Sequence, residues 1–523
     1  MLIDANTIPG GTVLDCDLCI VGSGPAGLTI AHKLRDQGIS IILLDSGFAD
    51  FDERAQALNN GRNVAMEYLD LEACRLRMFG GSSNHWEGSC NSFDAIDFQD
   101  RPWVKHGGWP ITKGDLETYY DGAHRYLQLG PNDHDLASWT RRLGLPMPDW
   151  LGGPLEGRVS HHSPPTRFGE VYGQDLDQAA NVRVLMGATA LEVALSDDRR
   201  AARQIGVGRY GQDRIAVQAK RFVLAMGGIE NARFLLLNEL GNEHDQVGRY
   251  FMEHPYFRLM LLAPSPRFVA SYAALSRGLD KADPHVGPSI RFSEAMLRRH
   301  EFQNCRMALE PTTRYEAAAG IESFHELTVG GKATDETLYH IGNLLLDIDM
   351  MAEAVARRAL GKRIIPAAGE LSHLTVGCMA EQLPNPDSRV LLGQARDAFG
   401  QRKTELALRL TDDDRIAAGR FMRAVGETFG QVGIGRVRNL VADRFAPWPP
   451  RQINYGNHHM GTTRMSRDPK TGVVDSNLRL HSLSNLFVAG SSVFPTGGHV
   501  PPTLTIVAMS LRLADHLVQT AHG

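Results

Sequence analysis

The sequence predicts an α/β fold in which a parallel sheet is assembled from distant segments and an antiparallel sheet with helices is inserted between them. Residues 14–45 read as an apolar strand, a glycine turn, a helix and a second apolar strand. This order is typical of two parallel strands joined by a crossover helix. Residues 182–193 also read as a strand, and strand and helix patterns return at 215–240 and at 485–518. Apolar and polar residues alternate at 375–382, 388–392 and 404–411, which predicts strands of an antiparallel sheet.

The composition weighs against several classes of protein. Of the 523 residues, 43% are hydrophobic, which is enough for a large core. The net charge of −5 leaves no basic excess to neutralise nucleic-acid phosphates. The first residues lack the pattern of a signal peptide, and no apolar stretch is long enough to cross a bilayer. A cytoplasmic location is therefore expected.

The six cysteines are sparse for this length, so no disulfide framework is expected. Cys16 and Cys19 have a spacing that also occurs in metal and redox sites. They lie, however, within an apolar run at 14–21 that reads as a buried strand. We therefore expect both thiols to pack in the core, and no metal site is predicted.

The glycine turn of the first unit has the spacing of a dinucleotide-binding loop. Gly22 permits a tight turn, Gly24 lets a pyrophosphate approach the backbone, and Gly27 allows close packing of helix and strand. Asp45 ends the next strand, where a carboxylate can accept hydrogen bonds from ribose hydroxyls. The pattern predicts a dinucleotide site but does not distinguish FAD from NAD(P).

Five further segments carry a more specific signal. They are residues 79–86 (FGGSSNHW), 224–230 (LAMGGIE), 381–390 (EQLPNPDSRV), 457–465 (NHHMGTTRM) and 488–496 (VAGSSVFPT). Together with the N-terminal unit, and in this order, they resemble the glucose–methanol–choline (GMC) oxidoreductase family, which oxidises alcohols with FAD. The resemblance covers almost the whole chain and is weakest at 264–370.

The resemblance implies two domains and a reaction. It predicts a discontinuous, Rossmann-like FAD-binding domain at 1–112, 178–263 and 475–523, and a substrate-binding domain at 113–177 and 264–474. The implied cofactor is FAD, and the implied reaction is removal of a hydroxyl proton by a base with hydride transfer to flavin N5. The motifs are most similar to the bacterial sugar-oxidising and pyranose oxidase branches, so a sugar, glycoside or polyol substrate is expected.

The resemblance also implies the cofactor-binding residues. Those expected to contact FAD are Gly22, Gly24, Pro25, Ala26, Gly27, Asp45, Ser46, Gly80, Gly81, Asn84, His85, Trp86, Ala190, Gly490, Ser491, Val500, Pro501 and Thr503. A helix beginning near Thr503 would stabilise negative charge on the reduced flavin. His85 occupies the position of a histidine that is covalently joined to flavin in the pyranose 2-oxidase branch. Asn84 replaces the threonine found there, which favours a noncovalent cofactor.

Two histidines are the candidate catalytic residues. His458 lies three residues before Gly461, where the family has its catalytic histidine, and is assigned as general base. The family's second catalytic residue is a His or Asn at the position of Pro501, which has no side-chain donor. We hypothesise that His499 replaces it and binds the substrate oxygen. Alternatively, His458 works with water or with a residue of the substrate domain, and His499 is structural.

Other functions are compatible with part of the same sequence. An NAD(P)-linked dehydrogenase could use the same glycine loop, and a noncatalytic electron-transfer subunit could bind the same flavin. The histidine motif at 457–465 favours the enzyme. The motifs do not choose between oxygen and another electron acceptor, and they do not define the oligomeric state.

Overall fold

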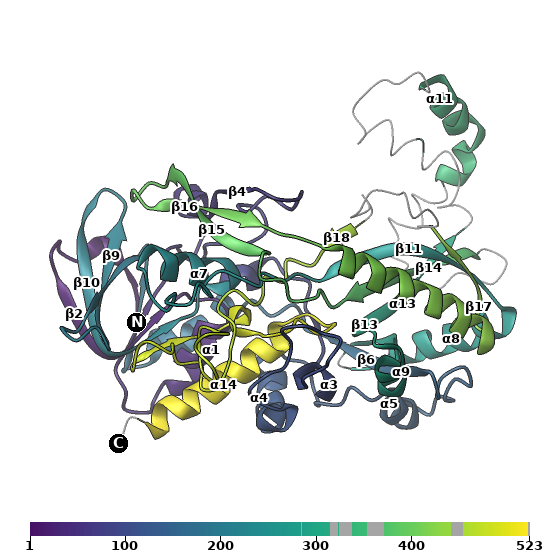
Figure 1. Cartoon of the computed structure of the whole chain (residues 1–523), viewed down its shortest axis with the longest axis horizontal. Helices are drawn as coiled ribbons and strands as arrows, with labels where there is room; N and C mark the ends of the chain where they lie inside the picture. The colour runs from purple at the N-terminus through teal and green to yellow at the C-terminus, as the bar shows by residue number, and fades with distance from the viewer. Residues whose placement is uncertain (284, 314–322, 324–336, 353–370, 441–452, 521–523) are drawn as a thin grey trace.

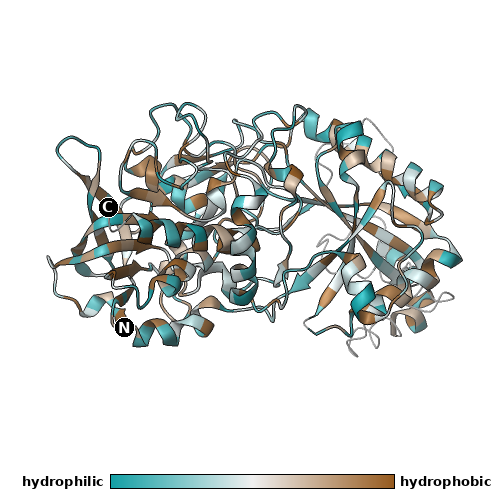
Figure 2. Cartoon of the chain, turned by 90° about the horizontal axis from the view of Figure 1, so that it is seen from below, coloured by the Kyte–Doolittle hydropathy of each residue, from teal (hydrophilic) through white to brown (hydrophobic). Residues whose placement is uncertain are grey.

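The structure is a computed structural model that describes residues 1–523 except 284, 314–322, 324–336, 353–370, 441–452 and 521–523. Two parts lie side by side in Figure 1. A mostly parallel sheet forms the core of the left-hand part, and an antiparallel sheet forms that of the right-hand part. Apolar residues are concentrated on the strands of both sheets and on the helix faces that cover them (Figure 2).

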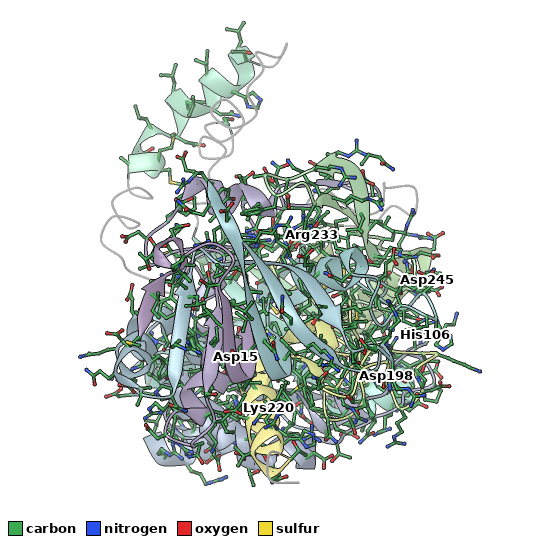
Figure 3. All side chains as sticks on the ribbon, turned by 90° about the vertical axis from the view of Figure 1, so that its left-hand side faces the viewer. Asp15, His106, Asp198, Lys220, Arg233 and Asp245 are labelled. Carbon is green, nitrogen blue, oxygen red and sulfur yellow. The ribbon has the colours of Figure 1, made fainter. Side chains whose placement is uncertain are left out.

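The first sheet is assembled from segments far apart in the sequence. Its order is β1 (Leu2–Asp4), β7 (Val182–Met186), β3 (Ile41–Leu44), β2 (Val13–Val21), β10 (Gln212–Leu224), β9 (Ala202–Arg209) and β8 (Thr189–Leu195), with β19 (Leu486–Val488) also paired to β10. Strands β1, β7, β3, β2, β10 and β19 pair in parallel, whereas β9 and β8 are antiparallel. Figure 3 shows this sheet from the side, with Asp15 of β2 and Lys220 of β10 on adjacent strands.

Helices cover this sheet and complete the predicted unit. Helix α1 (Pro25–Leu34) joins β2 to β3, and α14 (Thr503–Gln519) packs against both α1 and α4 (Glu117–Tyr126). Helix α7 (Gly227–Leu237) follows β10 directly. Because β19 and α14 come from the end of the chain, the predicted α/β fold with a discontinuous nucleotide-binding part is confirmed.

Two expectations differ from the structure in detail. Residues 182–193 were expected to form one strand but form β7 and β8, because Gly187 turns the chain at φ +69°. The range 113–177 was expected in the substrate-binding part. Helices α4 and α6 (Phe168–Gln178) nevertheless pack against α14, α1 and β7, so this range is divided between the two parts.

The second sheet is antiparallel throughout. Its order is β17 (Gly435–Asn439), β11 (Pro255–Pro264), β14 (Leu371–Ala380), β13 (Cys305–Thr313), β12 (Val286–Phe292), β6 (Leu155–His162) and β5 (Ser89–Cys90), with β18 (Ile453–Tyr455) also paired to β11. The described helices packed on this sheet include α5 (Leu136–Leu143), α8 (Pro266–Leu279), α9 (Glu294–His300) and α13 (Asp412–Gln431). Helix α13 packs on β17 and α8 on β12, which completes a second apolar core.

A small third sheet packs on α7 of the first part. Its strands are β15 (Arg389–Arg396), β16 (Arg402–Ala407) and β4 (Gly61–Asn63), so the expected strands at 388–392 and 404–411 pair here and not in the large antiparallel sheet. The remaining elements are the helices α2 (Glu53–Gln56), α3 (Ala95–Phe98) and α11 (Thr337–Leu346), and the 3-10 helices η1 (Ala5–Thr7), η2 (Ala57–Asn59), η3 (Gly81–Asn84), η4 (Lys113–Leu116) and η5 (Ser491–Val493). Helix α11 stands away from the body at the top of Figure 1.

Two further observations concern the cysteines and the length of the apolar helices. All six cysteines are free thiols. Both Cys16 and Cys19 lie in β2, and Cys19 is buried as predicted, whereas Cys16 is only partly buried. None of the helices in the described part of the chain is long and apolar enough to span a membrane.

Candidate active site

One large cavity lies where the two parts meet. Its volume is about 590 Å³, and it extends from the turn between β2 and α1 to His458. The first residues of α1, α7 and α14 all line it. Because the N-terminus of a helix presents unpaired N–H groups and a partial positive charge, these three helices favour a ligand that carries negative charge.

The three glycines of the turn have different surroundings. A Cβ atom on Gly22, whose φ is +103°, would lie 2.6 Å from the carbonyl oxygen of Ala225. A Cβ atom on Gly27 would lie 1.9 Å from the carbonyl oxygen of Gly22. A Cβ atom on Gly24 would meet no protein atom within 4 Å, and Gly24 lines the cavity. Two of the glycines therefore permit close packing, and the third leaves the backbone accessible to a ligand.

We expect Gly27→Ala to abolish stable cofactor retention. The added methyl group must displace the Gly22 carbonyl, which moves the turn that lines the cavity. The measurement is the ratio of flavin to protein absorbance after purification, together with the melting temperature. Gly419→Ala in α13 is the matched control, because a Cβ atom there meets nothing within 4 Å. Normal flavin content in Gly27→Ala would contradict the assigned packing role.

Asp45 ties the end of β3 to the glycine turn. Its Oδ2 accepts hydrogen bonds from the backbone N and the hydroxyl of Ser23, and its Oδ1 accepts one from Gly47 N at 2.7 Å. The Ser23 hydroxyl in turn accepts a hydrogen bond from Gly80 N at 3.1 Å. A carboxylate has about four acceptor positions, so Asp45, which lines the cavity, retains capacity for a ligand hydroxyl.

A buried cluster of charges lines the same end of the cavity. Glu230, on α7, accepts hydrogen bonds from Arg75 at 2.8 Å, Arg77 at 2.7 Å and Arg233 at 3.2 Å. Burial alone would raise the pKa of Glu230, but the three guanidinium groups hold that pKa well below its usual value. Arg77 also donates to the Ser46 hydroxyl at 3.0 Å. Arg233, one of the three arginines of this cluster, is labelled in Figure 3. Sequence reasoning missed this cluster, although Glu230 lies in one of the quoted segments.

Most of the predicted cofactor-binding residues line the cavity. Those that do are Gly22, Gly24, Pro25, Ala26, Asp45, Ser46, Gly81, His85, Trp86, Ala190, Gly490, Ser491, Pro501 and Thr503. Those outside the lining are Gly27, Gly80, Asn84 and Val500. Asn84 donates to the carbonyl oxygen of Phe79 at 2.9 Å, and Val500 is buried in the core of the first part. These two side chains support the walls of the cavity from behind.

His458 lines the opposite end of the cavity, and its neighbour is His254. The two Nδ1 atoms are 2.8 Å apart. His254 Nε2 lies 3.0 Å from the carbonyl oxygen of Gly497 and 3.1 Å from that of Gly498. Since carbonyl oxygens only accept hydrogen bonds, His254 Nε2 carries the proton, and in the neutral ring its Nδ1 is an acceptor.

This arrangement fixes the tautomer of His458. Its Nδ1 must donate to His254, which leaves its Nε2 with a free lone pair. In the described part of the chain, no side chain or backbone group hydrogen-bonds to that Nε2, and His458 faces the cavity. Burial lowers the pKa of His254 to about 4 and the pKa of His458 well below its usual value, so both rings are neutral near pH 7. The cavity therefore contains an unprotonated imidazole nitrogen.

Glu253 holds the segment that carries His458. Its Oε1 accepts hydrogen bonds from the Tyr68 hydroxyl and from His458 N, both at 2.7 Å. Its Oε2 accepts from His254 N at 2.7 Å and from Gly456 N at 3.2 Å. Burial raises the pKa of Glu253 to about 7. The carboxylate thus fixes the backbone on both sides of the histidine pair.

His499 lies elsewhere than the hypothesis requires. It does not line the cavity, and its ring is buried beside the carboxylates of Asp94 and Asp97, at 3.6 Å and 3.7 Å. The neighbour of His458 is His254 instead. His459, next in sequence to His458, contacts the Tyr68 hydroxyl at 3.0 Å and the ring of Phe251.

We expect the protein to lose stability as the pH falls below about 6.5. Burial lowers the pKa of His124 and His254 to about 4 and that of His459 to about 3. A histidine whose pKa is lower in the folded chain gains its proton on unfolding, so its stabilisation is lost between about pH 6.5 and 4. Glu253 acts in the opposite sense between about pH 7 and 4.5, and so do Asp97, Glu156 and Asp414, whose pKa values burial also raises. These carboxyl groups are outnumbered by the histidines whose pKa burial lowers. The measurement is the melting temperature at pH 7.5 and pH 5; an unchanged or higher value at pH 5 would contradict this expectation.

Comparison with known proteins agrees with the geometry of the site. A family model described as "FAD dependent oxidoreductase" matches residues 17–265, and one described as "GMC oxidoreductase" matches residues 384–510. The chain belongs to the GMC oxidoreductase family. It is an FAD-dependent enzyme that acts on alcohol groups.

This GMC oxidoreductase is similar to relatives over almost its whole length. It is 24% identical to the fructose dehydrogenase large subunit of Gluconobacter japonicus, with 97% of this chain and 98% of the relative covered. It is 25% identical to the 6'''-hydroxyparomomycin C oxidase of Streptomyces lividus, with 97% and 93% covered. The solved structure of pyridoxine 4-oxidase from Mesorbium loti shares the fold, with a TM-score of 0.57, 18% identity and coverage of 97% and 99%.

The cavity of this GMC oxidoreductase fits FAD. Cβ atoms on Gly24 and Gly490 would meet no protein atom, so the backbone lies open to the cofactor at two separate positions. The N-terminus of α1 and the arginine cluster around Glu230 suit a pyrophosphate. Asp45, at the end of β3, suits the ribose hydroxyls. The remainder of the cavity extends toward His458.

Proposed function

We propose that this enzyme oxidises a hydroxyl group of a sugar, glycoside or polyol, with His458 as the general base. The observation that carries the proposal is the free Nε2 of His458, an unprotonated imidazole nitrogen that faces the same cavity as the FAD-binding turn. The names of the two relatives given above, a fructose dehydrogenase subunit and a paromomycin-type oxidase, support a carbohydrate substrate.

His458 removes the proton of the substrate hydroxyl at its Nε2. An alkoxide is a far better hydride donor than an alcohol, so this proton transfer prepares the carbinol carbon for oxidation. FAD, when bound, supplies the hydride acceptor. His254 keeps the proton of His458 on Nδ1 and stabilises the imidazolium that forms, because its own Nδ1 accepts that hydrogen bond. Glu253 keeps the segment in place through His458 N.

Anaerobic mixing with candidate substrates tests the proposal. The purified protein is expected to carry oxidised flavin, and its visible absorbance should be lost with at least one member of a panel of sugars, glycosides, polyols and simple alcohols. Admission of air then distinguishes an oxidase, whose colour returns quickly, from a dehydrogenase that needs another acceptor. Retention of full colour with every compound would contradict the proposed oxidation.

A further inference from the structure

Arg306 is an unusual residue at the His458 end of the cavity. It lies on β13 opposite Met379 of β14, and both residues line the cavity together with Ser89 and His458. The antiparallel sheet of the second part therefore presents a guanidinium group to the region in which the substrate of the proposed reaction must lie. Neither the reaction nor the FAD-binding turn requires a cation at this place.

Among the described residues, the guanidinium of Arg306 hydrogen-bonds to hydroxyl groups only. Its Nη1 donates to the Ser160 hydroxyl at 3.2 Å and to the Ser89 hydroxyl at 3.5 Å. Within the described ranges of the chain, no carboxylate lies within 4 Å of it. Burial lowers its pKa, which reflects the cost of the uncompensated charge. An arginine has five N–H donors, so most of this donor capacity remains for a ligand.

Other buried arginines of the second part differ from Arg306 in this respect. Arg101 forms a two-pronged ion pair with Glu381, with contacts of 2.7 Å and 2.5 Å. Arg291 pairs with Asp94 and with Glu156. The carboxylates near β13 are thus already satisfied by their own arginines. None of the carboxylates of Glu381, Asp94 and Glu156 forms an ion pair with Arg306.

The remaining carboxylates near Arg306 do not compensate its charge either. Glu310, on the same strand, accepts from the Tyr256 hydroxyl at 2.5 Å and from Arg258 at 2.9 Å. Glu87 lines the cavity close to Ser89, but its side chain is exposed and forms no ion pair with Arg306. The His458 end of the cavity therefore holds one uncompensated positive charge.

We propose that Arg306 binds a carboxylate group of the substrate, so that the substrate is an acidic sugar or polyol such as a uronate or an aldonate. This inference rests on the proposed function and specifies its substrate. A guanidinium offers two parallel N–H donors that match the two oxygens of a carboxylate. One guanidinium balances the single charge of a carboxylate. The Ser89 and Ser160 hydroxyls both accept from Nη1 of Arg306 and so hold the guanidinium in one orientation. A phosphate dianion would leave a negative charge unbalanced.

The test compares neutral and acidic substrates that differ at one carbon. Suitable pairs are glucose with glucuronate and galactose with galacturonate, each followed by anaerobic flavin reduction over a range of concentrations. The acidic member should reach half-saturation at a concentration about tenfold or more lower, because a charge-assisted pair contributes at least that factor. In Arg306→Gln this preference should disappear, so that both members reach half-saturation at similar concentrations. Arg306→Lys should retain part of the preference.

Matched controls separate this role from others. Arg436→Gln removes an exposed guanidinium from β17 of the same sheet and should leave the preference intact. Calorimetric titration with tetrahydropyran-2-carboxylate, which has no hydroxyl to oxidise, should give a dissociation constant that rises about tenfold or more in Arg306→Gln. This binding measurement does not depend on turnover, so it tests Arg306 even if no compound reduces the flavin.

Three results would overturn the inference. The first is equal or better use of the neutral member by the wild-type enzyme. The second is an equal loss of rate with both members in Arg306→Gln, which would indicate a structural or flavin-directed role. The third is tighter binding of a sugar phosphate than of the matching uronate, which would replace the carboxylate by a phosphate. Absence of reduction by every compound would instead contradict the proposed function.

Discussion

Replacement of His458 by glutamine is expected to slow anaerobic flavin reduction by ~10²–10⁴-fold, the usual contribution of a positioned general base. The amide fills a similar volume but cannot take up a proton. Because His458 is far along the cavity from the glycine turn, the variant should still purify with FAD. The measurement is the rate of loss of oxidised-flavin absorbance with saturating substrate in a stopped-flow instrument.

His244→Gln is the matched control for this variant. It makes the same change at an exposed histidine and should reduce at the wild-type rate. A His458→Gln enzyme with normal flavin content and an unchanged rate would contradict the assignment of the base. A loss of flavin would instead show that His458 is needed for the shape of the cavity.

Replacement of His254 by leucine is expected to slow the same step by about 10–100-fold, the range typical of residues that orient a reacting group. Leucine removes the acceptor for His458 Nδ1–H, so the proton is no longer confined to that nitrogen. It also removes the donor to the carbonyl oxygens of Gly497 and Gly498. The variant should show a changed pH dependence of the rate as well as a lower maximum.

His254→Gln separates this role from simple packing. The glutamine amide can accept from His458 and donate to the glycine carbonyls, so it should recover most of the rate that leucine loses. Both variants are to be compared at equal flavin content across pH 5.5 to 9. Equal rates in the leucine and glutamine variants would show that His254 acts only by filling space.

The sequence predicted the parts of the fold and site that depend on local pattern. The roles of the three turn glycines could be predicted, because a strand–turn–helix unit that binds a dinucleotide has no room for a side chain at Gly22, Gly24 and Gly27. The position of Asp45 could be predicted because β3 runs parallel to β2, so the end of β3 lies at the same edge of the sheet as the glycine turn. The return of the chain to this sheet at β19 was also predictable, since its strand and helix repeat the pattern of the first unit.

The rest of the site depends on contacts between distant residues. His254 and His458 are 204 positions apart. Their segments are brought together by the pairing of β11 with β18, by the bridge between Met252 and Met460, and by the hydrogen bonds to Glu253. His499 was hypothesised to bind the substrate oxygen because it is close to Pro501 in the chain, but its ring lies beside Asp94 and Asp97 and outside the cavity lining. A signal was nevertheless present: Glu253 and His254 are adjacent ionisable residues just before an apolar strand, an unfavourable position unless they have buried partners.

In the proposed reaction, a substrate carbinol hydrogen leaves as hydride while His458 takes the hydroxyl proton. The most direct measurement is anaerobic flavin reduction by the best substrate of the panel, deuterated at the carbinol carbon, in the wild type and in His458→Gln. We predict that deuteration slows reduction in the wild type and that His458→Gln is much slower with either isotope. A wild-type rate that is insensitive to deuteration, together with an undiminished rate in His458→Gln, would contradict the account.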